Sequence, residues 1–151
     1  MSDRFFEYFI RWRHTRGYGV HSPLAYGIVR ECIRPDSLYA YYADTEIDAI
    51  FCDDRRKRRK ARMLLRLANQ LKTSSLSTIG LDHDIGKAVM KACDIDIKDA
   101  ATWGKRESDV LVTFGDISPE FGSDIPSLTL KGRDYSIYVW REGMQSVIYL
   151  I

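Results

Sequence analysis

No run of apolar residues in this 151-residue sequence approaches the about 20 residues that a membrane-spanning helix needs. Near the start of the chain, Arg11 and Arg13 interrupt an aromatic stretch, so the apolar region of a signal peptide is missing there as well. The formal net charge is only +2, which argues against a molecule that binds polyanions over its whole surface. We therefore expect a cytoplasmic protein without membrane contact.

Cysteine is equally scarce. The three residues of this type, Cys32, Cys52 and Cys93, are odd in number, lie far apart and sit in apolar patterns. They argue against a disulfide scaffold and predict buried, reduced thiols. No Cys/His metal spacing, phosphate-loop motif or internal repeat is visible. With 45% hydrophobic and 29% charged residues, the chain has the composition of one soluble globular domain.

Residues 1–73 have the apolar periodicity of helices. Ser22 and Pro23 suit the start of a second helix, Pro35 ends it, and a fourth helix is expected from about Arg56 to Lys72. The inward-facing residues predicted for the four helices are Phe5, Phe6, Phe9 and Trp12; Ala25, Ile28, Val29 and Cys32; Tyr39, Ala43, Ile47, Ile50 and Phe51; and Leu64, Leu67, Ala68 and Leu71.

Residues 74–151 change to the pattern of strands. A strand is expected over 75–79, a helix over 84–93, and further strands over 109–114, 127–130, 135–140 and 145–151. Residues 141–143 suit a hairpin turn between the last two strands. The chain is therefore predicted to be an α/β protein: one structural unit with an N-terminal helical cap and a small Rossmann-like sheet that ends in an antiparallel C-terminal hairpin.

Several segments resemble, in the same order, a family of bacterial class I S-adenosylmethionine-dependent methyltransferases. Residues 16–24, RGYGVHSPL, resemble the family's N-terminal HGVHSPF signature, and residues 41–49, YYADTEIDA, resemble its next helix. Residues 60–69 are similar to the helix before the first strand, and residues 76–86 to the cofactor loop. Residues 135–151 are similar to the closing strand pair. The chain is shorter than such methyltransferases, so the resemblance identifies it as a shortened member.

The resemblance implies an S-adenosylmethionine site at the end of the first strand. The residues it assigns to the cofactor are Gly80, Asp82, Gly86, Asp116 and His21, and the acid expected to bind ribose is Asp94, Asp96 or Asp99. His21 has the alternative role of packing and hydrogen bonding at its turn.

The sequence departs from the family at two places. Thr78 stands where the cofactor loop has an acidic residue, and bulky side chains fill the turn that follows Gly80. In residues 109–116, DVLVTFGD, Phe114 occupies the position of the acid beside the methyl-transfer site. We therefore expect methyl transfer to be weak or lost. The alternative is an active small-molecule methyltransferase that works by positioning and whose substrate the sequence does not identify.

The pair His83-Asp84 also imitates the metal motif of HD-type phosphohydrolases. That motif needs an upstream histidine on a helical fold, yet no histidine lies between His21 and His83, and the residues before His83 are strand-like. We reject the metal interpretation. A simpler interpretation is that Asp82 or Asp84 caps the helix that begins there.

Six consecutive basic residues form the strongest local charge feature, Arg55, Arg56, Lys57, Arg58, Arg59 and Lys60, which we call the basic run. It suits the phosphates of nucleic acid or another acidic partner. The alternative is a solvated loop and helix start beside Asp53 and Asp54, mobile at its beginning. No aromatic residue interrupts the run, so base stacking is not indicated there. Exposed edge strands would also permit a homodimer.

Overall fold

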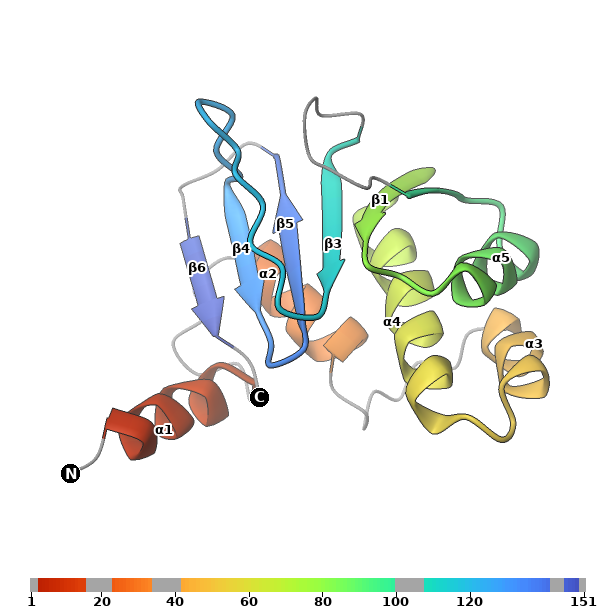
Figure 1. The fold of residues 1–151 in the computed structure, drawn as a ribbon, viewed down its shortest axis with the longest axis horizontal. Coiled ribbons are helices and arrows are strands. Elements are labelled where there is room, and N and C mark those ends of the chain that lie inside the picture. Colours follow the sequence, from red (N-terminus) through yellow and green to blue (C-terminus); the bar gives the residue numbers. More distant parts are fainter. Residues whose placement is uncertain (1–2, 16–22, 34–41, 100–107, 142–145, 150–151) are drawn as a thin grey trace.

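The structure, a computed structural model, describes residues 3–15, 23–33, 42–99, 108–141 and 146–149 (Figure 1). Its helices are α1 (Asp3–Thr15), α2 (Pro23–Ile28) with the π-helix η1 (Val29–Ile33) directly after it, α3 (Tyr42–Ile50), α4 (Arg55–Leu71) and α5 (His83–Ala92). Its strands are β1 (Ser75–Ile79), β2 (Asp96–Asp99), β3 (Val110–Phe114), β4 (Leu128–Lys131), β5 (Tyr135–Val139) and β6 (Ser146–Tyr149).

The described strands form one six-stranded sheet in the order β2-β1-β3-β5-β4-β6. β1 pairs in parallel with β2 and β3, and β4 pairs in parallel with β6. β5 alone runs in the opposite direction, between β3 and β4. All strands except β5 therefore end at the same edge of the sheet, which we call the carboxyl edge. The predicted α/β class with a helical N-terminal region is confirmed.

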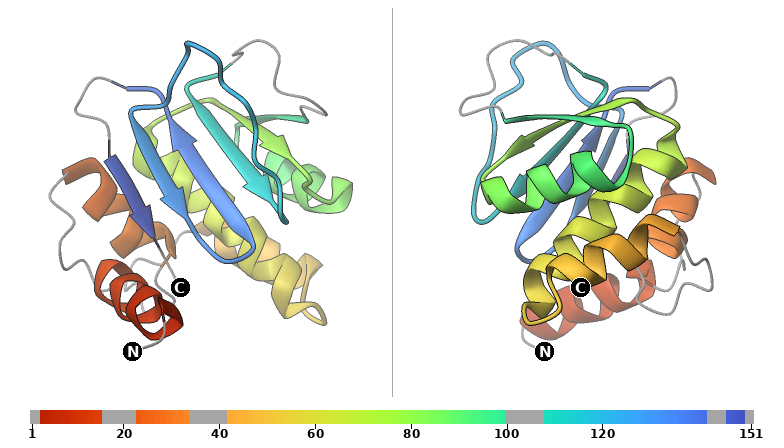
Figure 2. Two further views of the ribbon diagram at one scale, coloured as in Figure 1. Left: turned by 60° about the vertical axis from the view of Figure 1, so that its left-hand side comes forward. Right: turned by 90° about the vertical axis from the view of Figure 1, so that its right-hand side faces the viewer.

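The two faces of the sheet are covered differently. One face packs on the helices, and Leu76, Val112 and Ile137 of the strands share a continuous core with Ile28, Leu64 and residues of α5. In the left view of Figure 2, α4 and α5 lie behind the strands. The other face holds a smaller cluster of Ile79, Leu111, Tyr138 and Trp140, which is covered by Ile117 and Phe121. The main core therefore includes residues of both helices and strands.

The amphipathic pattern of α4 predicts its position well. Asp54 caps the helix by accepting a hydrogen bond from the amide of Lys57, and Lys72 ends it in the left-handed conformation at φ 52°. Leu64, Leu67 and Leu71, on one face, are 0–1% exposed. All six residues of the basic run are helical, so the prediction that the run begins as a loop is wrong.

Other predictions for the N-terminal half need correction. Phe9 is 45% exposed and Ile50 is 49% exposed, although both were assigned to buried stripes. Cys52 is exposed and Cys93 is partly buried, so only Cys32 has the buried environment expected of all three thiols. Tyr39, predicted to face inward on the third helix, lies outside the described residues. Phe9 and Ile50 follow the apolar period, but neither belongs to the main core of the described structure.

The predicted hairpin between the last two strands is also wrong. β4 and β5 form the antiparallel hairpin, closed by a bond from the amide of Gly132 to the carbonyl of Tyr135. Both edges of β5 are then occupied, by β3 and β4, so β6 pairs with the free edge of β4. The turn residues 142–143 lie outside the described residues. The short strand β2 was not placed from sequence, because its four residues, DIKD, have little apolar character.

Candidate functional site

Two neighbouring parallel strands, β1 and β3, send their connections to opposite faces of the sheet. After β1 the chain enters α5, whose Ile85 and Val89 are buried in the main core. After β3 the chain crosses to the other face, where Ile117 and Phe121 pack. Open α/β sheets bind ligands in the crevice between such diverging connections. Four of the five cofactor residues implied by the resemblance follow these strands: Gly80, Asp82, Gly86 and Asp116.

Both glycines at this edge face other atoms of the protein. Gly80 has φ +77°, and a Cβ there would lie 2.6 Å from the carbonyl oxygen of Phe114 and 3.1 Å from Cδ1 of Ile117. A Cβ on Gly86 would lie 3.7 Å from Cδ2 of Leu81, an ordinary contact. The closest approach at Gly80 is therefore made by the end of β3.

The aspartates at the start of α5 have different environments. Asp82 occupies the N-cap position without a side-chain cap bond, whereas Asp84 accepts a hydrogen bond from the amide of Ile85 at 3.0 Å. The Nζ of Lys57 donates to Asp84 at 2.5 Å. This hydrogen bond is the main cause that lowers the pKa of Asp84 and raises the pKa of Lys57. The basic run and the predicted cofactor loop are therefore in direct contact.

The end of β3 differs from the methyl-transfer position that the resemblance implies. Phe114 is only 4% exposed, and Nζ of Lys60 lies 5.3 Å from the centre of its ring. Asp116, two residues further on, is exposed. Among the three ribose candidates, Asp99 is paired in register with Thr78 at the carboxyl end of β2, whereas Asp96 begins that strand and Asp94 precedes it. Asp116 and Asp99 are thus the acids placed at the carboxyl edge beside β1.

The basic run lies along the first turns of α4. Arg55, Arg56 and Arg59 are exposed, and the remaining three residues of the run are partly buried. Because Lys57 reaches α5 and Lys60 covers Phe114, this end of α4 lies against the carboxyl edge of the sheet. Two candidate regions that are separate in sequence, the basic run and the loop after β1, form one surface.

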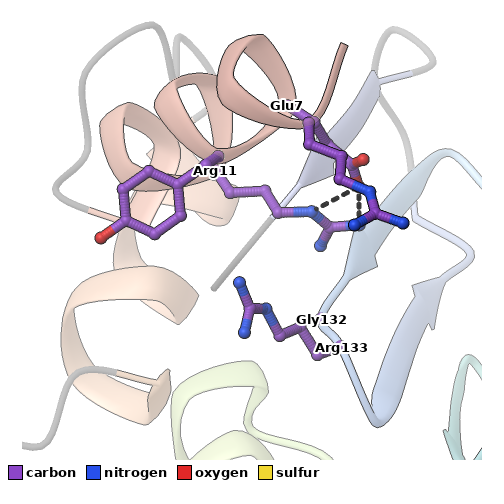
Figure 3. Close-up of a pocket in the computed structure, with 6 residues that line it drawn as sticks. Glu7, Arg11, Gly132 and Arg133 are labelled. Atoms are coloured by element: carbon purple, nitrogen blue, oxygen red, sulfur yellow. Dashed lines mark hydrogen bonds and ion pairs between the residues drawn. The ribbon is translucent and has the colours of Figure 1, made fainter. Parts of the chain in front are cut away.

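A further group of charged residues was not found from the sequence. A hollow of about 330 Å³ lies between α1 and the β4–β5 turn, and we call it the arginine hollow (Figure 3). Arg11 donates to Glu7 at 3.0 Å and to the backbone oxygen of Lys131 at 3.2 Å. The residues that line the hollow are Arg4, Glu7, Tyr8, Arg11, Gly132 and Arg133. The four residues from α1 are more than 120 positions from Gly132 and Arg133 in the chain, so only the fold brings the two groups together.

Tyr135 lies between the arginine hollow and the basic run. Its ring packs on the turn, since a Cβ on Gly132 would lie 2.5 Å from Cε1 of Tyr135. Burial raises the pKa of Tyr135 and Asp134 raises it further, whereas the positive charges of Arg59 and Arg11 lower it. Tyr135 also pairs in register with Phe114, and Lys60 of the basic run lies over the Phe114 ring, so both basic regions lie at the carboxyl edge.

His21 lies outside the described residues, so its assignment to the cofactor stays a prediction. Within the described parts of the chain, no group of three His, Cys, Asp or Glu side chains is arranged to hold a metal ion. None of the described helices has the length and apolar character required to cross a membrane. Comparisons of the chain with models of protein families, with curated proteins and with solved structures give no match.

Proposed function

We propose that the chain is a methyltransferase-like protein in which S-adenosylmethionine binding and methyl transfer are weak or lost. Gly80 carries this proposal. Its left-handed backbone at the end of β1 suits the glycine turn of a cofactor loop, yet the carbonyl of Phe114 occupies the space beside it. A ligand that approached Gly80 from the side of a Cβ would have to displace the end of β3.

The charges around the turn support the same proposal. S-adenosylmethionine carries a positive sulfonium group, and the approach from α4 presents Lys57 and Lys60. Asp84 is already paired with Lys57, and Phe114 replaces an acid at the methyl-transfer position. One paired carboxylate and one missing carboxylate both weaken the attraction of the turn for a cationic cofactor.

Calorimetry with S-adenosylmethionine and with its demethylated product tests the proposal. We expect no binding heat and no rise in melting temperature at millimolar ligand. A binding-competent site would add about 2.7 kcal/mol at 100 times the dissociation constant. Micromolar binding that is lost in Asp116→Asn but kept in Asp94→Asn would contradict the proposal and support an active small-molecule methyltransferase.

A second proposal is that the exposed face of the basic run binds a polyanion, with nucleic acid as the first candidate. The capped, helical start of α4 supports it, because Arg55, Arg56 and Arg59 are held on a folded surface. Each phosphate neutralised by such a side chain adds about 0.9 to the slope of log affinity against log salt for duplex DNA. Replacing Arg55 and Arg56 with glutamine should lower that slope. An unchanged slope, or binding that ignores salt, would remove this proposal.

A further inference from the structure

We infer that the arginine hollow binds single-stranded nucleic acid, with Arg4 and Arg133 at phosphates and the ring of Tyr8 under a base. This inference deepens the polyanion proposal and rests on it, because it gives the strand a second contact region on the carboxyl edge. It concerns residues of α1 and the β4–β5 turn rather than the basic run.

The lining of the arginine hollow has an excess of positive charge. The hollow is lined by three arginines and one carboxylate, Glu7. Glu7 is paired with Arg11, and the described part of the chain supplies no such partner for Arg4 or Arg133. Figure 3 shows Arg133 extending from the turn toward the space below Arg11. Guanidinium groups with free donors are suited to phosphate oxygens, which they bind in pairs of hydrogen bonds.

Arg11 has a different role, because its donors are already engaged. Nε and NH2 bind Glu7, NH1 binds the backbone of Lys131, and the guanidinium lies 5.6 Å from the ring centre of Tyr149. Arg11 therefore joins α1, the β4–β5 turn and β6. We assign it as a positioning residue that fixes the hollow before the ligand arrives.

Two aromatic side chains of α1 are exposed at or beside the hollow. Tyr8 lines the hollow and is 50% exposed, and Phe9 beside it is 45% exposed. The guanidinium of Arg13 lies 5.9 Å from the ring centre of Phe9. Single-stranded nucleic acid is bound by this combination, since cations follow the backbone and unpaired bases stack on aromatic faces. An acidic peptide would use the arginines but has no base to stack on Tyr8.

A single nucleic-acid strand can contact both the hollow and the basic run. Tyr135 packs against Gly132 of the hollow and pairs in register with Phe114 of β3, and Nζ of Lys60 lies 5.3 Å from the centre of the Phe114 ring. The hollow and the basic run therefore meet at one edge of the sheet. A chain of phosphates that leaves the hollow past Tyr135 reaches the first turns of α4. Site sizes of about 4–16 nucleotides are usual for single-strand-binding folds, which matches one compact surface.

Fluorescence anisotropy with labelled oligonucleotides of about 12 nucleotides tests the inference. The probes are single-stranded DNA, the matching RNA and the same sequence as a duplex, each measured between about 50 and 200 mM salt. Tyr8→Ala should weaken single-strand binding about tenfold and leave duplex binding nearly unchanged, whereas Tyr8→Phe should bind like the unmodified chain. Equal DNA and RNA affinity would indicate stacking and phosphate contact alone, and tighter RNA binding would add a contact to the ribose hydroxyl; both support the inference.

The double variant Arg4→Gln/Arg133→Gln tests the phosphate contacts. It should reduce the salt slope for single strands by about 1.4, which is two contacts at about 0.7 each. The control is Lys72→Asn/Lys91→Gln, which removes the same charge from two other exposed residues. Lys72 directly follows α4, and Lys91 lies in the last turn of α5. The control should keep the slope of the unmodified chain.

Several outcomes would overturn the inference. They are unchanged single-strand binding in Tyr8→Ala, an unchanged slope in Arg4→Gln/Arg133→Gln, and tighter binding to anionic lipid vesicles or polyglutamate than to the oligonucleotides. If only Arg55→Gln/Arg56→Gln weakens binding, the polyanion proposal stands and the hollow is excluded. If no oligonucleotide binds at low salt, both proposals fail. Melting temperatures of the variants show whether each one is folded.

Discussion

Thr78 and its neighbour Ser77 show how different two buried hydroxyls can be. Both side chains are at most 1% exposed, but Oγ of Ser77 lies 2.7 Å from Oγ of Ser108, whereas Oγ1 of Thr78 has no hydrogen-bond partner within the described structure. A buried hydroxyl without a partner costs about 1–3 kcal/mol. The position that carries an acid in the resembling family is therefore a weak point in this strand.

We predict that Thr78→Val raises the free energy of unfolding by about 1 kcal/mol, because valine keeps the shape and removes the unpaired hydroxyl. Ser77→Ala should lower it by about 1 kcal/mol, because that hydroxyl is bonded. Urea denaturation of both variants measures the two changes. A loss of stability in Thr78→Val would mean that its hydroxyl has a partner.

The Lys57–Asp84 pair predicts a pH dependence at both ends of the scale. The pKa of Asp84 is lowered from its ordinary 3.8, so the contribution of the pair to stability is present above that pH and is lost as pH falls through the lowered value. The pKa of Lys57 is raised from 10.5, so the contribution is present below that pH and is lost as pH rises through the raised value. The pair should be intact throughout the neutral range.

NMR titration of the Asp84 carboxyl group measures this effect directly. In Lys57→Met the pKa of Asp84 should rise toward 3.8, whereas Lys60→Met should leave it where it is. The change in stability should be small, because the two side chains are 34% and 50% exposed and water screens their charges. If the pKa of Asp84 does not respond to Lys57→Met, the basic run does not contact the loop in solution.

Helix α4 begins at a side-chain cap, whereas α5 has none. Its first turn contains no acidic side chain and six basic residues begin it, which the positive end of the helix disfavours. The carboxylate of Asp54 offsets this by accepting from the amide of Lys57 at 3.1 Å. The cap explains how an unfavourable charge pattern can still be helical from its first residue.

Asp54→Ala should therefore lower the free energy of unfolding by about 1 kcal/mol. Asp53→Ala is the matched control, since it removes the same charge from an exposed neighbouring residue, and it should cost less than about 0.5 kcal/mol. Thermal and urea unfolding give both values. Equal losses in the two variants would show that charge near the basic run, rather than the cap bond, stabilises α4.

The elements that the sequence predicts correctly are those with a strong local period. The bounds of β1 agree at both ends, and α4 and α5 each begin one residue before their predicted start. Strand order has no such local signal, because it depends on which edges remain free once β5 lies between β3 and β4. The wrong hairpin follows from that, since neighbouring strands in the sequence were assumed to pair.

The candidate site, like the fold, could be predicted only where its residues are close together in the sequence. The basic run and the loop after β1 are continuous in sequence and could be found there, but their contact through Lys57 and Asp84 could not. The arginine hollow joins α1 to the β4–β5 turn, and no periodicity connects those residues. The exposure of Tyr8 beside the hollow was equally hidden, because Tyr8 is not part of the apolar stripe predicted for the first helix and the sequence does not show which elements lie next to it.

For the whole molecule, the distribution of charge matters more than its sum. The net charge is only +2, yet the basic run, with Lys60 over Phe114, and the arginine hollow both lie at the carboxyl edge. At a pH near the isoelectric point of about 8.4 the chain carries no net charge. Any retention by a cation exchanger at that pH then reports the local concentration of positive side chains.

We therefore predict that the protein is retained near pH 8.4 and that Arg55→Gln/Arg56→Gln elutes at clearly lower salt. Lys72→Asn/Lys91→Gln has the same net charge as that variant but loses its charges away from the carboxyl edge, and it should elute close to the unmodified protein. Asparagine is chosen at position 72 because it tolerates the left-handed backbone there, at φ 52°. If the two double variants elute together, the charges act only through their sum, and the carboxyl edge is no separate binding surface for polyanions.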